Sequence, residues 1–159
     1  MPRKVTKSLI RQVPADRIYQ SIQVQKLINR VMLNGKKQLA EKLVYDGMQK
    51  AADRLKVQNP LDVFDQAMRN IQPHLETRSR RVGGANYQIP FEVKGQRQQH
   101  LTTMWFVAAA RSHKGMSMVD RIANELQDAY NNQGSAVRKR EDTHKMADAN
   151  RAFAHFARF

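Results

Sequence analysis

The sequence of 159 residues contains no cysteine, a single tryptophan, five prolines and seven glycines. The absence of cysteine excludes disulfides and thiolate chemistry and fits a reducing compartment. No run of residues approaches the roughly 18 consecutive apolar residues that a membrane span needs. The amino terminus is basic but lacks the apolar stretch of a secretory signal. These absences are compatible with a cytoplasmic protein and argue against a membrane segment.

Acidic residues are also scarce, since 14 Asp and Glu stand against 28 Lys and Arg, giving a formal net charge of +14. On a chain of one-domain length, such a charge causes self-repulsion that a polyanion would relieve. The bases gather in residues 1–13, 36–37, 78–81 and 138–140, whereas residues 101–133 are neutral and contain the most apolar stretch. This distribution disfavours a free small-molecule enzyme and favours nucleic acid as the partner.

Hydrophobic periodicity is mostly helical, with segments that begin near residues 24, 40, 60, 96, 117 and 135. Residues about 74–94 alternate instead between apolar and polar, which is typical of half-buried strands. We therefore predict a mainly α fold: a single domain, residues 1–159, of about six helices with one protruding antiparallel β-hairpin. This domain includes a basic amino-terminal tail, 1–13, and a basic carboxyl-terminal surface helix, about 135–155.

The turn of the hairpin lies around Gly83-Gly84. A two-residue loop would place Leu75 opposite Glu92 and Tyr87 opposite Arg80, mixing apolar and charged residues on one face. A three-residue loop, 82–84, pairs Leu75 with Phe91, Thr77 with Ile89 and Ser79 with Tyr87, and leaves one face apolar. Because a one-residue slip inverts every side chain, we predict the three-residue loop.

Catalytic and metal-binding patterns do not emerge. The five histidines lack metal-ligand spacing and have no cysteine to join them, and Gly83-Gly84 is not followed by the Lys-Ser/Thr of a phosphate-binding loop. Adjacent Glu141 and Asp142 point in different directions on a helix. Trp105 and Phe106 sit at helical spacing among alanines and are expected in the core. We predict no catalytic residue, no metal and no cofactor, and hence no enzyme.

The arginines favour RNA over DNA as the partner. Arg donates bidentately to phosphate and stacks on bases, which suits irregular RNA, and neither a helix-turn-helix nor zipper heptads are present. An alternative remains open at this point: a free-standing basic regulator that binds messenger RNA or DNA.

Several motifs resemble one known family. Ser79-Arg80-Arg81-Val82-Gly83-Gly84 followed by Tyr87-Gln88, Gly35-Lys36-Lys37, Trp105 with Ala108-Ala109-Ala110-Arg111, and Ala136-Val137-Arg138-Lys139-Arg140-Glu141-Asp142 are similar to segments of the bacterial small-subunit ribosomal protein number seven family. The resemblance covers nearly the whole chain in order.

The resemblance implies a structural constituent of the ribosome, in the small subunit of a cytoplasmic ribosome. It implies a primary binder of the 3′ major domain of small-subunit rRNA, which nucleates assembly of the head and lies at the subunit interface near the decoding region and exit-site tRNA. The implied partners are this rRNA, exit-site tRNA, small-subunit proteins nine and eleven and, in some members, the protein's own mRNA. We expect no membrane partner and no homo-oligomer.

Matching positions assign rRNA contacts to fifteen basic residues: Arg3, Lys4, Lys7, Arg11, Lys36, Lys37, Arg78, Arg80, Arg81, Arg97, Arg111, Lys114, Arg138, Lys139 and Arg140. The tRNA-proximal hairpin tip is expected to comprise Arg80, Arg81, Val82, Gly83, Gly84, Ala85 and Asn86.

Overall fold

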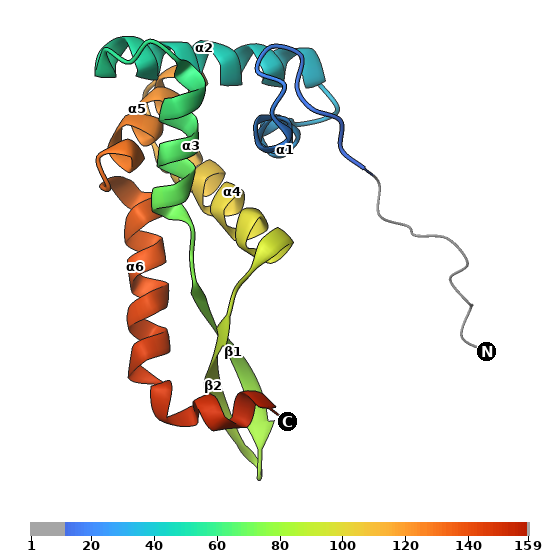
Figure 1. Ribbon diagram of the computed structural model, residues 1–159, viewed down its shortest axis with the longest axis vertical. Coiled ribbons are helices and arrows are strands. Elements are labelled where there is room, and N and C mark those ends of the chain that lie inside the picture. Colours follow the sequence, from blue (N-terminus) through green and yellow to red (C-terminus); the bar gives the residue numbers. More distant parts are fainter. Residues whose placement is uncertain (1–11, 159) are drawn as a thin grey trace, which may run out of the picture.

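The computed structural model describes residues 12–158, which form six α-helices, one 3₁₀ helix and a two-stranded antiparallel sheet (Figure 1). The prediction of a mainly helical fold with one β-hairpin is therefore confirmed. The elements are α1 (Ile22–Val31), α2 (Lys37–Leu55), α3 (Pro60–Ile71), β1 (Leu75–Val82), β2 (Ala85–Glu92), α4 (Gly95–Ser112), α5 (Met118–Tyr130), α6 (Gly134–Ala149) and η1 (Arg151–Arg158). Among the helices of residues 12–158, none is long and apolar enough to cross a membrane.

Helix ends lie where local side-chain chemistry sets them. The Asn59 side chain caps α3 by accepting from the Leu61 amide at 3.1 Å, and Pro60 occupies the first turn, where its missing N–H costs nothing. Ser117 caps α5 in the same way, through the amide of Asp120. Such caps satisfy amides that a helix leaves unpaired at its start.

The core lies among α1 to α5 and includes the start of α6, where Ala136 and Val137 are buried. Trp105 and Phe106 of α4 are 8% and 0% exposed, so the expectation that they pack in the core is confirmed. Helix α2 packs closely on α5 at Gly47, where an added Cβ would lie 2.6 Å from Cγ2 of Ile122. The lack of a side chain at Gly47 therefore permits this crossing.

Helix α6 and the hairpin extend from the same side of the helical body, and η1 crosses from the end of α6 to the hairpin (Figure 1). The prediction of one helix over about 135–155 is wrong in its extent, because α6 ends at Ala149. At the boundary, the Asn150 side chain donates to the carbonyl of Met146 at 2.8 Å. This bond satisfies one of the last carbonyls of α6, and the chain turns there toward the hairpin.

The predicted three-residue hairpin loop is wrong. Val82 pairs with Ala85 and Leu75 with Glu92, so the loop consists of Gly83 and Gly84 alone. Both glycines have positive φ, 57° and 91°, the combination that a type I′ turn requires. Such a turn matches the twist of the flanking strands, and its backbone geometry outweighs the separation of polar and apolar side chains.

The mixed face that results from this register is nevertheless stable. Arg78 lies opposite the fully buried Ile89, and its guanidinium carbon lies 5.3 Å from the centre of the Phe91 ring. A long arginine stem can cover apolar surface while its charged end stays in water, and the cation is attracted to the ring face. The charge on this face therefore does not prevent the burial of its apolar residues.

Candidate nucleic-acid interface

The hairpin forms an arm whose outer part carries exposed cations. Arg80 and Arg81 are exposed, as are the glycines of the turn. A Cβ added at Gly83 or Gly84 would meet nothing within 4 Å, so the tip is thin and open. The predicted tip, residues 80–86, thus lies at the end of the arm farthest from the core (Figure 1).

A carboxylate at the base of the arm holds two of the predicted arginines. Glu76 is 6% exposed, and its Oε1 accepts from Nε of Arg78 at 2.6 Å. Its Oε2 accepts from Nε and Nη2 of Arg97, at 3.1 and 3.0 Å. Burial alone would raise the pKa of Glu76, but the hydrogen bonds and charges of the two arginines outweigh it and lower that pKa. Glu76 therefore ties β1 to the start of α4.

A groove of about 600 Å³ lies between α1 and α4, next to the base of the arm. Its polar lining includes Lys26, Arg30, Gln99 and His100, and no acidic residue of the described chain is part of the lining. Lys26 Nζ donates to Oε1 of Gln99 at 2.7 Å, and Nη2 of Arg30 lies 3.0 Å from Nδ1 of His100. These contacts hold the cationic side chains across the groove.

The groove has positive potential where His100 lies. Burial lowers the pKa of His100, and the charges of Arg30 and Arg97 lower it further. A phosphate placed beside His100 would be attracted by the charges of Arg30 and Arg97. The sequence analysis missed Lys26, Arg30 and His100, because their helices lie about seventy residues apart and none belongs to a run of bases.

Four further predicted residues lie on loops and helix ends. Arg111 Nη2 donates to the carbonyls of Arg30 and Val31, at 3.4 Å each, so it lies at the carboxyl end of α1 near the groove. Lys36 and Lys37 are exposed at the start of α2, and Lys114 is exposed between α4 and α5. These contacts bring Arg111 beside Arg30, one of the groove residues.

The three bases of α6, residues 138–140, have different surroundings. Arg138 and Lys139 are exposed, whereas Arg140 is partly buried and donates to the carbonyl of Asn70 and, at 3.3 Å, to Oδ1 of Asn132. Arg140 thus ties α6 to the end of α3. Only Arg138 and Lys139 keep their charged ends exposed to solvent.

The start of α6 rests on a buried carboxylate that the sequence analysis did not single out as functional. Glu125 of α5 is 0% exposed, and its Oε1 accepts from the amide of Ala136 at 3.0 Å. Its Oε2 lies 3.4 Å from both Oγ of Ser135 and Nε2 of His113. A carboxylate is favoured at a helix amino terminus, so Glu125 fixes the direction in which α6 leaves the body.

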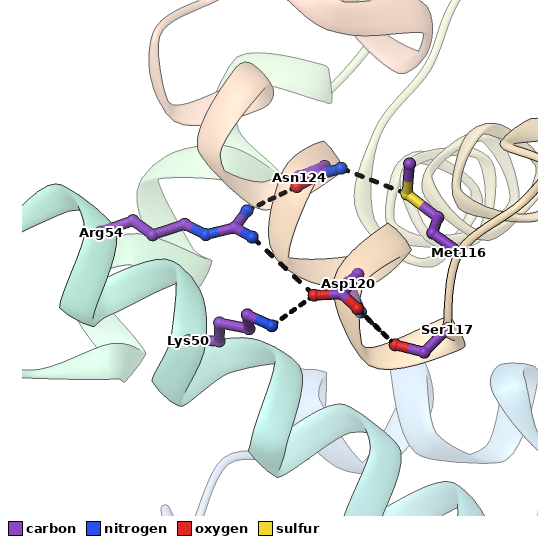
Figure 2. Close-up of polar contacts among 6 residues, drawn as sticks. All are labelled: Lys50, Arg54, Met116, Ser117, Asp120 and Asn124. Atoms are coloured by element: carbon purple, nitrogen blue, oxygen red, sulfur yellow. Dashed lines mark hydrogen bonds and ion pairs between the residues drawn. The ribbon is translucent and has the colours of Figure 1, made fainter.

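Two bases of α2 are held by side chains of α5. Figure 2 shows Lys50 and Arg54 of α2 reaching Asp120 and Asn124 of α5, while Asp120 also accepts from Ser117. The hydrogen bonds from Lys50 and then Ser117 lower the pKa of Asp120. These bases tie α2 to α5, which sets them apart from the cations of the groove and arm.

Residues Arg3, Lys4, Lys7 and Arg11, predicted to contact rRNA, lie outside the described residues. Within residues 12–158, no group of three or more acidic or histidine side chains could hold a metal ion.

A basic helical domain with cations along a groove and on a projecting arm belongs to the class of structural nucleic-acid-binding proteins. Residues 2–151 match the family described as ribosomal protein S7p/S5e. The chain belongs to the ribosomal protein S7p/S5e family, and it is accordingly a ribosomal protein and not an enzyme.

Curated relatives agree with this assignment. The chain is 51% identical over 148 residues to small ribosomal subunit protein uS7 of Chloroflexus aurantiacus, covering 93% of this chain and 94% of that protein. It is 50% identical over 157 residues to the protein of the same name from Herpetosiphon aurantiacus, covering 99% and 98%. The Thermotoga neapolitana protein of that name is 51% identical over 146 residues, covering 92% and 94%.

Proposed function

We propose that the chain is a primary rRNA-binding protein of the small ribosomal subunit in the cytoplasm. It binds the 3′ major domain of small-subunit rRNA and nucleates assembly of the subunit head. The observation that carries this proposal is the set of basic side chains in the α1–α4 groove and at the base of the hairpin arm. Lys26 and Arg30 line the groove, and Arg97 and Arg78 meet at Glu76.

The arrangement suits RNA of irregular shape. Among the described residues, the lining of the groove supplies donors and no carboxylate, and the arm carries Arg80 and Arg81 on a narrow ribbon whose turn consists of two glycines. Phosphate contacts position such a protein, while arginines on a thin arm enter grooves and loops of folded RNA. In the proposed assembly, the body contacts rRNA and the arm tip, residues 80–86, approaches exit-site tRNA at the subunit interface.

The same proposal includes the protein neighbours implied by the family: small-subunit proteins nine and eleven. Binding to the protein's own mRNA would use the same cationic surface, because one RNA fold can imitate another at the level of shape.

A binding competition tests the rRNA assignment. Labelled 3′ major domain rRNA competes against scrambled RNA of equal length and against duplex DNA, at about physiological salt. We expect a preference of at least about 10³ for the rRNA fragment. Equal, salt-sensitive binding to all three would refute specific recognition and favour a general polyanion surface.

Two variants locate the interface. Lys26→Ala/Arg30→Ala removes two charges from the groove, and the control Lys42→Ala/Lys145→Ala removes two exposed charges from α2 and α6. We expect the groove variant to lose affinity and to have a salt slope shallower by about 0.7–0.9 per lost phosphate contact, in contrast to the control. Equal losses in both variants would contradict the role of the groove.

A third variant, Arg80→Ala/Arg81→Ala, distinguishes the contribution of the arm to RNA binding from that of the helical body. We expect a modest loss of rRNA affinity, with a larger loss of tRNA retention in the assembled subunit. Unchanged tRNA retention would count against the proposed position of the arm tip.

A further inference from the structure

The short helix η1 lies against the outer part of the hairpin (Figure 1). Ring centroids of Phe153 and Phe156 lie 5.0 and 5.8 Å from that of Tyr87 on β2. Arg80 Nη1, on β1, donates to the carbonyl oxygen of Phe156 at 3.3 Å. Since Arg80 and Tyr87 are opposite each other in the register, η1 contacts both strands at the same level.

The outer part of the hairpin has few other sources of stability. Among the described side chains of residues 79–88, Tyr87 alone is not fully exposed. The base, in contrast, buries Ile89 and holds the pairing of Glu76 with Arg97. An isolated two-stranded hairpin is marginally stable in water, so an outer half without packing would open frequently.

We infer that η1 is an intramolecular strap that docks on Tyr87 and keeps the outer half of the hairpin folded and in a fixed direction. The aromatic rings supply the attraction, and the hydrogen bond from Arg80 fixes the register of the strap on the hairpin. The turn of the chain at Asn150 directs η1 toward this face rather than along the axis of α6.

The family match ends at residue 151, so residues 152–158 of the strap lie beyond it. The inference therefore rests on the contacts of η1 and holds whether or not the arm meets tRNA. Its consequence for binding is preorganisation. An arm that is folded before it meets a partner avoids the ordering cost that would otherwise weaken association.

Amide hydrogen exchange of the full-length protein tests the strap. In the variant Phe153→Ala/Phe156→Ala, we expect amides of residues 79–88 to exchange at least about tenfold faster, because two aromatic contacts are lost. Amides of residues 75–77 and of α2 should keep their wild-type rates. The matched control is Arg151→Ala, which removes an exposed side chain from the same helix and should leave the hairpin amides unchanged.

Tyr87→Ala provides a second route to the same state, because it removes the docking ring and leaves η1 intact. Fluorescence of the buried Trp105 reports whether the helical body stays folded in each variant. Unchanged exchange at residues 79–88 in both variants would overturn the inference. Equal acceleration across the hairpin and the helices would overturn it as well, because the aromatic contacts would then support the whole fold.

A distance measurement between two spin labels tests whether the arm keeps a fixed direction relative to the helical body. Because the chain lacks cysteine, Asp46→Cys on α2 and Asn86→Cys on the arm allow a single pair of spin labels. We expect one narrow distance distribution in the otherwise wild-type chain and a broad one when Phe153→Ala/Phe156→Ala is added. A distribution that stays as narrow in the variant would contradict the orienting role of the strap.

Discussion

The substitution Gly47→Ala has two opposite effects on stability: it raises the helix propensity of α2, and it places a new methyl group against α5 where the two helices cross. In a helix interior, alanine is more favourable than glycine by about 1 kcal/mol. At this position, however, the new Cβ would lie 2.6 Å from Cγ2 and 2.9 Å from Cβ of Ile122. Ile122 is fully buried, and its Cβ is attached directly to the backbone of α5, so rotation of its side chain cannot relieve both contacts.

Overpacking of a well-packed core typically costs about 1–3 kcal/mol, and contacts this short belong at the upper end. After subtraction of the propensity gain, we expect Gly47→Ala to reduce the free energy of unfolding by about 1–2 kcal/mol. For a chain of this size, that corresponds to a Tm lower by roughly 2–8 °C, measured by circular dichroism. A variant as stable as the wild type, or more stable, would refute the argument from close approach.

A double-mutant cycle identifies the contact. In an Ile122→Ala background, Cγ2 is absent, so Gly47→Ala should cost less than in the wild-type chain. Leu126→Ala is the matched control, because Leu126 is buried on the same helix but contributes none of the three atoms nearest to the added Cβ. In that background the cost of Gly47→Ala should be unchanged.

Three further outcomes are expected. Glu125→Ala leaves the buried amide at the start of α6 unpaired and should lower the free energy of unfolding by about 1–3 kcal/mol in urea titrations; a smaller change would argue against its capping role. Asp120→Ala removes the ion pair with Lys50 and the hydrogen bond from Ser117, and should lower the free energy of unfolding slightly, by an amount that shrinks at high salt; a loss that does not depend on salt would contradict this expectation. Burial chiefly lowers the pKa values of His100 and His144, so the unfolded chain binds more protons, and stability should fall as the pH drops through about 6.5. A flat stability profile from pH 7.5 to 5.5 would contradict this last expectation.

The helices and their ends were predictable because the signals are local. A capping Ser117 and the pair Asn59-Pro60 act through neighbouring amides, so the sequence alone predicted where α5 and α3 begin. The neutral segment with Trp105 was likewise predicted as core, because apolar residues at helical spacing have few other uses.

The register of the hairpin was not predictable from its own two strands. Segregation of apolar and charged side chains favoured the wrong loop, because the two-residue loop places Leu75 opposite Glu92 and Tyr87 opposite Arg80. Part of the support for the observed hairpin comes from outside it, since Arg97 on α4 supplies the compensating charge for Glu76. The turn glycines carried the correct signal, since two successive glycines permit a two-residue turn.

The sequence indicated the residues of the candidate interface where several bases are adjacent in the chain. It did not indicate those that come together only when the chain folds. Arg80 and Arg81 lie in a visible basic run, whereas Arg30 and His100 meet only because α1 packs near α4. Arg140 is the opposite case, because it lies in a run of bases but its guanidinium donates to a backbone carbonyl at the end of α3. A run of basic residues in the sequence therefore indicates a high local charge, but it does not show which group each side chain contacts in the folded protein.

The number of paired residues in the hairpin sets how far its tip extends from the helical body. Each eight-residue strand spans about 27 Å, and one residue added to both strands would extend the tip by about 3.4 Å. That same addition, placed between Ile89 and Tyr87 and between their partners, would turn Tyr87 to the opposite face, away from η1. Two residues added per strand at that point would keep Tyr87 on the face that meets η1, although its ring would lie about 7 Å farther from the body. On the body side of Tyr87, additions in even steps should therefore disturb the docking of η1 less than single insertions do.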